Sequence, residues 1–141
     1  MRKTLLCAVF ALSCLGIVPH AGAQGGPFSG GPSITTDQAL QQAPKLDPTL
    51  IPLDKAFQAV QAKLKKSPKD AKVRTAYVDA AYKYGHAVMV DQGKMSPKVQ
   101  YRAALALYRK ALAVNPNHRP SKDEKKKIED IYMGMGMPIP K

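Results

Sequence analysis

Three methionines at alternate positions near the end of the chain have side chains that could hold a metal. Met133, Met135 and Met137 carry soft thioether sulfurs, which are ligands for monovalent copper. Gly134 and Gly136 would let the backbone bend so that the three sulfurs converge. The alternative is that Met133 packs as the last residue of a helix and residues 135–141 form a frayed C-terminal tail. We favour the alternative and expect no cofactor, which leaves a copper carrier as the third hypothesis for function.

The sequence offers few residues for catalysis. Both cysteines, Cys7 and Cys14, lie close to the N-terminus, and His86 and His118 are far apart and lack the spacing of metal ligands. Most Ser, Asp and Glu residues fall at expected helix caps, where local hydrogen bonds explain them. No glycine-rich loop follows a strand, as a nucleotide site would require. We therefore expect a protein that is not an enzyme.

The first 23 residues have the pattern of a secretory signal peptide. Arg2 and Lys3 precede an apolar stretch at 5–18, and Ala21-Gly22-Ala23 provides a small-x-small cleavage site. The apolar stretch is shorter than the roughly 20 residues that span a bilayer. A lipoprotein anchored through Cys14 is the less favoured alternative, because that residue lies inside the apolar stretch. We expect an exported protein, periplasmic or secreted, with no thiol and no transmembrane span after cleavage near Ala23.

The chain is strongly basic, with 22 Lys and Arg against 10 Asp and Glu. Such an excess favours anionic partners, including lipid head groups, acidic polysaccharides and acidic peptides. Nucleic acid is not expected, because export separates the protein from it. Solvated helix faces are the simplest explanation for the lysine runs, whereas a cationic binder of an anionic envelope polymer or lipid surface is the second hypothesis for function. The candidate anion-binding residues are Lys65, Lys66, Lys69, Lys72, Lys125, Lys126 and Lys127.

Two parts of the chain beyond the signal differ in composition. Residues 24–52 are rich in Gly, Pro, Ser, Thr and Gln, which indicates a flexible linker with at most a helical turn at 37–42. Apolar residues then recur at intervals of three and four, with no alternating strand pattern. We predict an all-α antiparallel array of about four helices over 53–134. They run from about 53 to 66, from Pro68 to the turn at 91–94, from about 97 to 114, and from 121 to about 133, with Ser67, Ser96 and Ser121 as N-caps.

The third predicted helix carries the most regular pattern, Ala104-x3-Tyr108-x2-Ala111-x4-Pro116. Small residues at these intervals let another helix approach closely, the aromatic ring fills the space between the two helices, and the proline ends the helix. The pattern resembles the second half of a tetratricopeptide repeat. This resemblance covers about 53–134 and implies that the following residues pack the repeat: Tyr77, Ala81, Tyr84, Gly85, Ala104, Tyr108, Ala111 and Pro116.

The resemblance also implies a binding surface, because tetratricopeptide hairpins stack with their first helices along a concave face. The second predicted helix would line that face with the side chains outside its apolar stripe, Thr75, Val78, Asp79, Tyr82 and His86. Tyr82 is the foremost contact, since a tyrosine ring is apolar with a polar tip, and its alternative role is packing against the fourth helix. The first hypothesis for function is an exported scaffold for protein or peptide partners in the cell envelope.

The register of the second helix has two solutions. The aromatic, small and aromatic positions of the family pattern match Tyr77, Ala81 and Tyr84. Counting from Pro68 instead places Arg74, Val78 and Ala81 at them. The sequence leaves both registers open.

Overall fold

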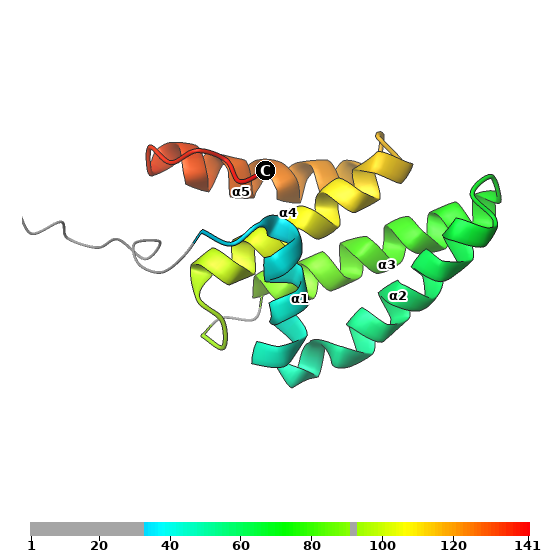
Figure 1. The fold of residues 1–141 in the computed structure, drawn as a ribbon. Coiled ribbons are helices and arrows are strands. Elements are labelled where there is room, and N and C mark those ends of the chain that lie inside the picture. The colour runs from blue at the N-terminus through cyan, green and yellow to red at the C-terminus, as the bar shows by residue number, and fades with distance from the viewer. Residues whose placement is uncertain (1–32, 91–92) are drawn as a thin grey trace, which may run out of the picture.

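The computed structural model describes residues 33–90 and 93–141. The predicted signal peptide at 1–23 and the part of the predicted linker at 24–32 lie outside the described residues. The described chain is all-helical, which confirms the predicted all-α array (Figure 1). The helices are α1 (Thr36–Leu46), the short 3-10 helix η1 (Pro48–Leu50), α2 (Ile51–Lys66), α3 (Ala71–Val90), α4 (Pro97–Val114) and α5 (Arg119–Gly134).

Helix α1 corrects the prediction of a flexible linker through residue 52. A capping box starts the helix: Gln38 N donates to Thr35 Oγ1 at 3.1 Å, and Thr35 N donates to Gln38 Oε1 at 2.8 Å. The helix lies across α4 (Figure 1) and buries Ala39 and Ala43 completely. The prediction was wrong for 33–52 because small alanines give a weak apolar signal, while α4 supplies most of the apolar surface at their contact.

Polar contacts hold both ends of α1. The buried carboxylate of Asp47 accepts from Thr49 N at 3.0 Å, which caps η1, and lies 3.2 Å from Lys94 Nζ. At the other end, a guanidinium N–H of Arg102 in α4 donates to the Ile34 carbonyl. A buried carboxylate needs such partners to offset its desolvation, so the segment before α2 is joined to α4 and to the α3–α4 turn.

Helix α3 packs against both α2 and α4 (Figure 1). Its buried side chains are Tyr77, Val78, Ala81, Tyr84, Gly85 and Val88. Tyr77, Ala81 and Tyr84 are all in the core whereas Arg74 is exposed, so burial favours the first of the two registers. Ala76, by contrast, is exposed on the side of α3 toward α2.

Helices α3 and α4 approach each other closely at Gly85. A Cβ atom built on Gly85 would lie 2.8 Å from Cε1 of Tyr108, and Tyr108 is itself fully buried. Only glycine leaves room for that ring. The face of α3 that carries Ala81 and Gly85 is therefore turned toward α4.

Helix α4 has the predicted bounds, and its predicted packing residues Ala104, Tyr108 and Ala111 are fully buried. The Ser96 hydroxyl caps it by accepting from Val99 N at 3.4 Å. Gln100 Nε2 donates to the carbonyls of Val88 and Met89 at 3.0 Å each, where the last turn of α3 leaves carbonyls without helical partners. Pro116 lies exposed in the turn after α4 rather than in the packed interface.

Helix α5 packs on α4, and the residues after it return along α5 (Figure 1). Met137 N donates to the Tyr132 carbonyl at 2.9 Å, and Thr36 Oγ1 donates to the Lys141 carbonyl at 3.0 Å. The expectation of a frayed tail at 135–141 is therefore wrong, since contacts with α5 and α1 hold it. None of the described helices combines the length and apolar composition of a membrane span.

Candidate functional site

The five predicted binding residues on α3 differ in their exposure. Thr75, Asp79 and His86 are exposed and Tyr82 is half-buried, but Val78 is only 3% exposed. The prediction of Val78 as an open contact therefore needs correction, because the turn of α3 toward α4 draws this side chain into the core. The remaining four, Thr75, Asp79, Tyr82 and His86, lie at the solvent-facing side of α3 or at its border.

A hollow of about 470 Å³ lies beside this face, where α3 meets the turn between α4 and α5. We call it the α3 groove. Three predicted residues line it, with Val78 reaching its floor. Its lining residues are Lys69, Ala71, Arg74, Thr75, Val78, Asp79, Val114, Asn115, Pro116 and His118. The sequence analysis missed Arg74, Asn115 and His118 as site residues.

Arg74 braces one wall of the α3 groove. Its guanidinium donates to the Val114 carbonyl at 2.5 Å and to the Pro68 carbonyl at 3.4 Å. The side chain thus ties the end of α4 to the turn before α3. An arginine side chain has five N–H donors in a planar fork, so these two bonds leave further donors for a partner.

Tyr82 lies between α3 and α5, next to the α3 groove. Its ring centroid is 5.5 Å from that of His118 in an edge-to-face arrangement, 5.9 Å from His86 and 6.2 Å from Tyr108. These distances are typical of aromatic pairs. The ring is held by both α4 and the start of α5, which supports the packing role, and its half-buried position also leaves surface for a partner.

His118 has a structural role at the groove. It is the N-cap of α5, with Ser121 N 3.4 Å and Ser121 Oγ 2.8 Å from its Nδ1 atom. The predicted cap, Ser121, instead lies inside the helix and is fully buried. The helix starts earlier than predicted because Pro120 fits its first turn without needing an amide donor. The imidazole ring is thereby fixed between Ser121 and Tyr82.

Two tyrosines of the core, Tyr84 and Tyr108, are shielded from water. Burial raises the pKa of Tyr108 far above its ordinary value, and nearby Glu124 and Tyr82 raise it further. Burial likewise raises the pKa of Tyr84, with a smaller contribution from Asp54. Loss of water around a phenol disfavours its charged form. The core around these two phenols is therefore a medium of low polarity.

The two predicted lysine clusters differ in their pairing. On α5, Lys125 pairs with Glu129 at 2.6 Å, Lys126 with Asp130 at 2.8 Å, and Lys127 with Glu124 at 2.7 Å. The hydrogen bond to Glu124 is the main cause that raises the pKa of Lys127. Lys65, Lys66, Lys69 and Lys72 are all exposed. The α5 lysines are thus largely neutralised by their own helix.

The three methionines belong to different surroundings. Met133 is 58% exposed on α5 and borders a hollow with Leu112 and Ile139, whereas Met137 packs against the core. The described part of the chain contains no group of three or more His, Cys, Asp or Glu residues that could hold a metal ion. Packing accounts for Met137, but the expectation that Met133 packs at the end of the helix is wrong, because its side chain is mostly exposed.

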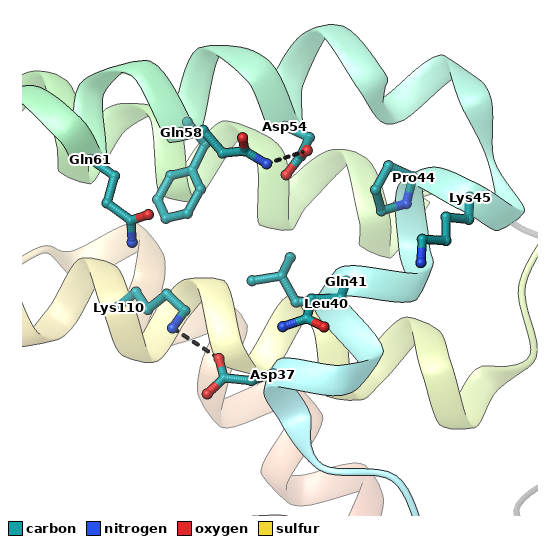
Figure 2. Close-up of a pocket in the computed structure, with 10 residues that line it drawn as sticks. Asp37, Leu40, Gln41, Pro44, Lys45, Asp54, Gln58, Gln61 and Lys110 are labelled. Atoms are coloured by element: carbon teal, nitrogen blue, oxygen red, sulfur yellow. Dashed lines mark hydrogen bonds and ion pairs between the residues drawn. The ribbon is translucent and has the colours of Figure 1, made fainter.

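A second hollow, of about 620 Å³, opens between α1, α2 and α4 (Figure 2). Asp37 on α1 pairs with Lys110 on α4 at 2.9 Å, and Gln58 donates to Asp54 at 2.7 Å on α2. Leu40 extends from α1 into the space between these polar groups (Figure 2). Sequence analysis missed this hollow because it depends on α1, which was predicted to be flexible. The ion pair between Asp37 and Lys110 helps to dock α1 on α4.

Comparison with models of protein families, with curated proteins and with solved structures found no match to this chain. Its function is therefore argued from the α3 groove and the surfaces around it.

Proposed function

We propose that this protein is an exported scaffold of the tetratricopeptide type that binds a peptide segment of a partner protein in the cell envelope. The α3 groove is the binding site in this proposal. Export follows from the signal-like first 23 residues. The repeat resemblance is supported by the burial of Tyr77, Ala81 and Tyr84 on α3 against Ala104 and Tyr108 on α4.

The observation that carries the proposal is the position of Tyr82, half-buried beside a hollow of about 470 Å³. Tyrosine and arginine are enriched among the residues that dominate binding energies at protein interfaces. Here Arg74 and His118 are already fixed by hydrogen bonds to the protein. Preformed side chains lose little entropy when a partner binds, so the groove is suited to recognition.

The lining indicates what kind of segment would fit. Val78, Val114 and Pro116 offer apolar surface, while Lys69 and Arg74 bring positive charge to the end nearest the α2–α3 turn. An extended peptide with an apolar residue followed by an acidic one would match both features. Asp79 supplies an acceptor for a backbone or side-chain donor of that peptide.

The test is selection of binding peptides from a random library on the purified protein, followed by two variants with the same added charge. Thr75 and Ala76 are adjacent exposed residues on α3, but Thr75 lines the α3 groove, whereas Ala76 lies on the side toward α2. Thr75→Arg should reduce the affinity of selected peptides by about tenfold or more, because it fills the groove, and Ala76→Arg should not. Equal affinities for both variants would exclude the α3 groove as the site.

A further inference from the structure

A group of cations lies around the turn between α2 and α3. We call it the basic tip and define it as Lys63, Lys65, Lys66, Lys69, Lys72 and Arg74. All six side chains are exposed. The three that belong to α2 lie in its last turn, where the helix dipole favours positive charge.

Acidic groups do not neutralise the basic tip. Asp70 is the nearest acid in sequence, and its Oδ1 atom accepts from Lys72 N at 2.8 Å and from Val73 N at 3.2 Å. Its carboxylate is thus engaged at the start of α3. No ion pair involves the tip lysines within residues 33–90 and 93–141. This differs from α5, where an acid lies three or four positions from each of Lys125, Lys126 and Lys127.

The basic tip also has a distinct place in the fold. The α2–α3 turn stands at one extremity of the molecule, away from α1 (Figure 1). Long lysine side chains at the end of a hairpin can reach a flat surface without any movement of the helices. A convex end of this kind fits a plane better than a single polymer chain, which needs a furrow to follow.

We propose that the basic tip binds an anionic lipid surface and orients the scaffold on it. The partner is a bilayer that carries acidic head groups, because such a layer offers many negative charges in one plane. Basic residues near such a surface each add to membrane affinity, and the effect falls off within a Debye length. This contact is separate from the α3 groove in its partner and in most of its residues.

The test is co-sedimentation of the purified chain with vesicles, using phosphatidylcholine alone or mixed with phosphatidylglycerol, at low and high salt. The tip variant replaces Lys63, Lys65 and Lys66 by Gln, none of which lines the α3 groove. The control replaces Lys125, Lys126 and Lys127 by Gln, so both variants lose the same charge. Circular dichroism checks that both retain helix content.

We expect the unmodified chain to bind the anionic vesicles, to release them at high salt, and to ignore phosphatidylcholine alone. The tip variant should lose about tenfold or more in partitioning, and the α5 control less than about threefold. Equal losses would overturn the proposal, since net charge alone would then explain binding. It would also be overturned if the protein bound a soluble polyanion such as alginate but not the vesicles, because an anionic polymer would then be the partner.

Discussion

Tyr82 and Tyr84 lie two residues apart on α3 and have opposite surroundings. The Tyr84 ring is fully buried, 6.3 Å from the ring of Phe57 on α2. Tyr82 is half-buried and touches two histidines at the border of the α3 groove. Successive residues of a helix point about 100° apart, so two positions are enough to change the side. One helix thus serves the core on one side and presents a candidate binding surface on the other.

The difference shows how a residue type acquires its role from its neighbours. Tyr84 and Tyr108 fill the space between helices, and their hydroxyl groups have no hydrogen-bond partner among the described residues. Tyr82 packs against Tyr108 and His118 and keeps part of its ring exposed. We therefore assign a role in stability to Tyr84 and Tyr108 and propose a role in recognition for Tyr82.

The largest expected effect on stability comes from truncating Tyr84, and the same truncation of Tyr82 is its comparison. Tyr84→Ala should lower the free energy of unfolding by about 3–5 kcal/mol, because it leaves a large cavity in the core. Tyr82→Ala should cost only about 1 kcal/mol, as expected for the loss of exposed aromatic contacts. Urea denaturation followed by circular dichroism measures both. Similar losses of unfolding free energy in the two variants would contradict the difference between the two sides of α3.

The close contact between α3 and α4 can be tested by adding volume. Ala104→Leu should destabilise the protein by about 1–3 kcal/mol, because Ala104 is fully buried where the two helices approach. Ala62→Leu is the matched control, since Ala62 is exposed on α2. Thermal unfolding distinguishes the two variants. An unchanged melting temperature for Ala104→Leu would contradict the tetratricopeptide-type packing.

Alkaline pH should lower the stability of the fold through the buried tyrosines of α3, α4 and α5. Burial is the first cause that raises the pKa of Tyr77, Tyr84, Tyr108 and Tyr132 above the ordinary value near 10. Above that pH the unfolded chain loses protons that the folded chain keeps, so stability is fully present below about pH 10 and falls as pH rises. Denaturation midpoints measured between neutral pH and pH 11 should show this decline.

A control for the alkaline decline is Tyr84→Phe, which removes one titrating phenol and keeps the ring. Its midpoint should fall less steeply with pH than that of the unmodified protein. A slope identical in both proteins would mean that Tyr84 ionises as freely in the folded state as in the unfolded chain.

The smallest expected effect is a difference in stability between substitutions of the α5 lysines and of the basic tip. Replacing Lys125, Lys126 and Lys127 by Gln should lower the stability slightly, because three intrahelical ion pairs are lost. The same change at Lys63, Lys65 and Lys66 should cost nothing measurable. High salt should reduce the difference between the variants. A greater loss at the basic tip would show that its lysines have structural partners.

The sequence was sufficient for elements with strong local signals. Ser96-Pro97 and Asn115-Pro116 marked both ends of α4, because a hydroxyl cap and prolines act within a few residues. Ser67 was assigned as a cap by the same logic, but it ends α2, while the carboxylate of Asp70 caps α3. Two competing caps lie three residues apart, and local rules could not choose between them.

The candidate site was only partly predictable. Thr75, Asp79 and Tyr82 followed from the helical period of α3. Arg74 and His118 did not, because their place depends on turns that only the tertiary fold brings together. The pairing of Lys125 with Glu129 could have been found, since acidic residues at i+4 are visible in the sequence.

The proposal that Tyr82 anchors a peptide in the α3 groove is tested most directly by titrating a selected peptide into the Tyr82→Ala variant at two salt concentrations. Tyr101→Ala is the control, since Tyr101 is also half-buried on α4, whereas the ring of Tyr82 packs against His118, which lines the α3 groove. If Tyr82 anchors the peptide, its loss should weaken binding by about tenfold or more at both salt concentrations, while helix content stays unchanged. The control should bind with nearly the original affinity. Unchanged affinity of Tyr82→Ala, together with binding that high salt abolishes, would contradict the assignment of the α3 groove as the peptide site.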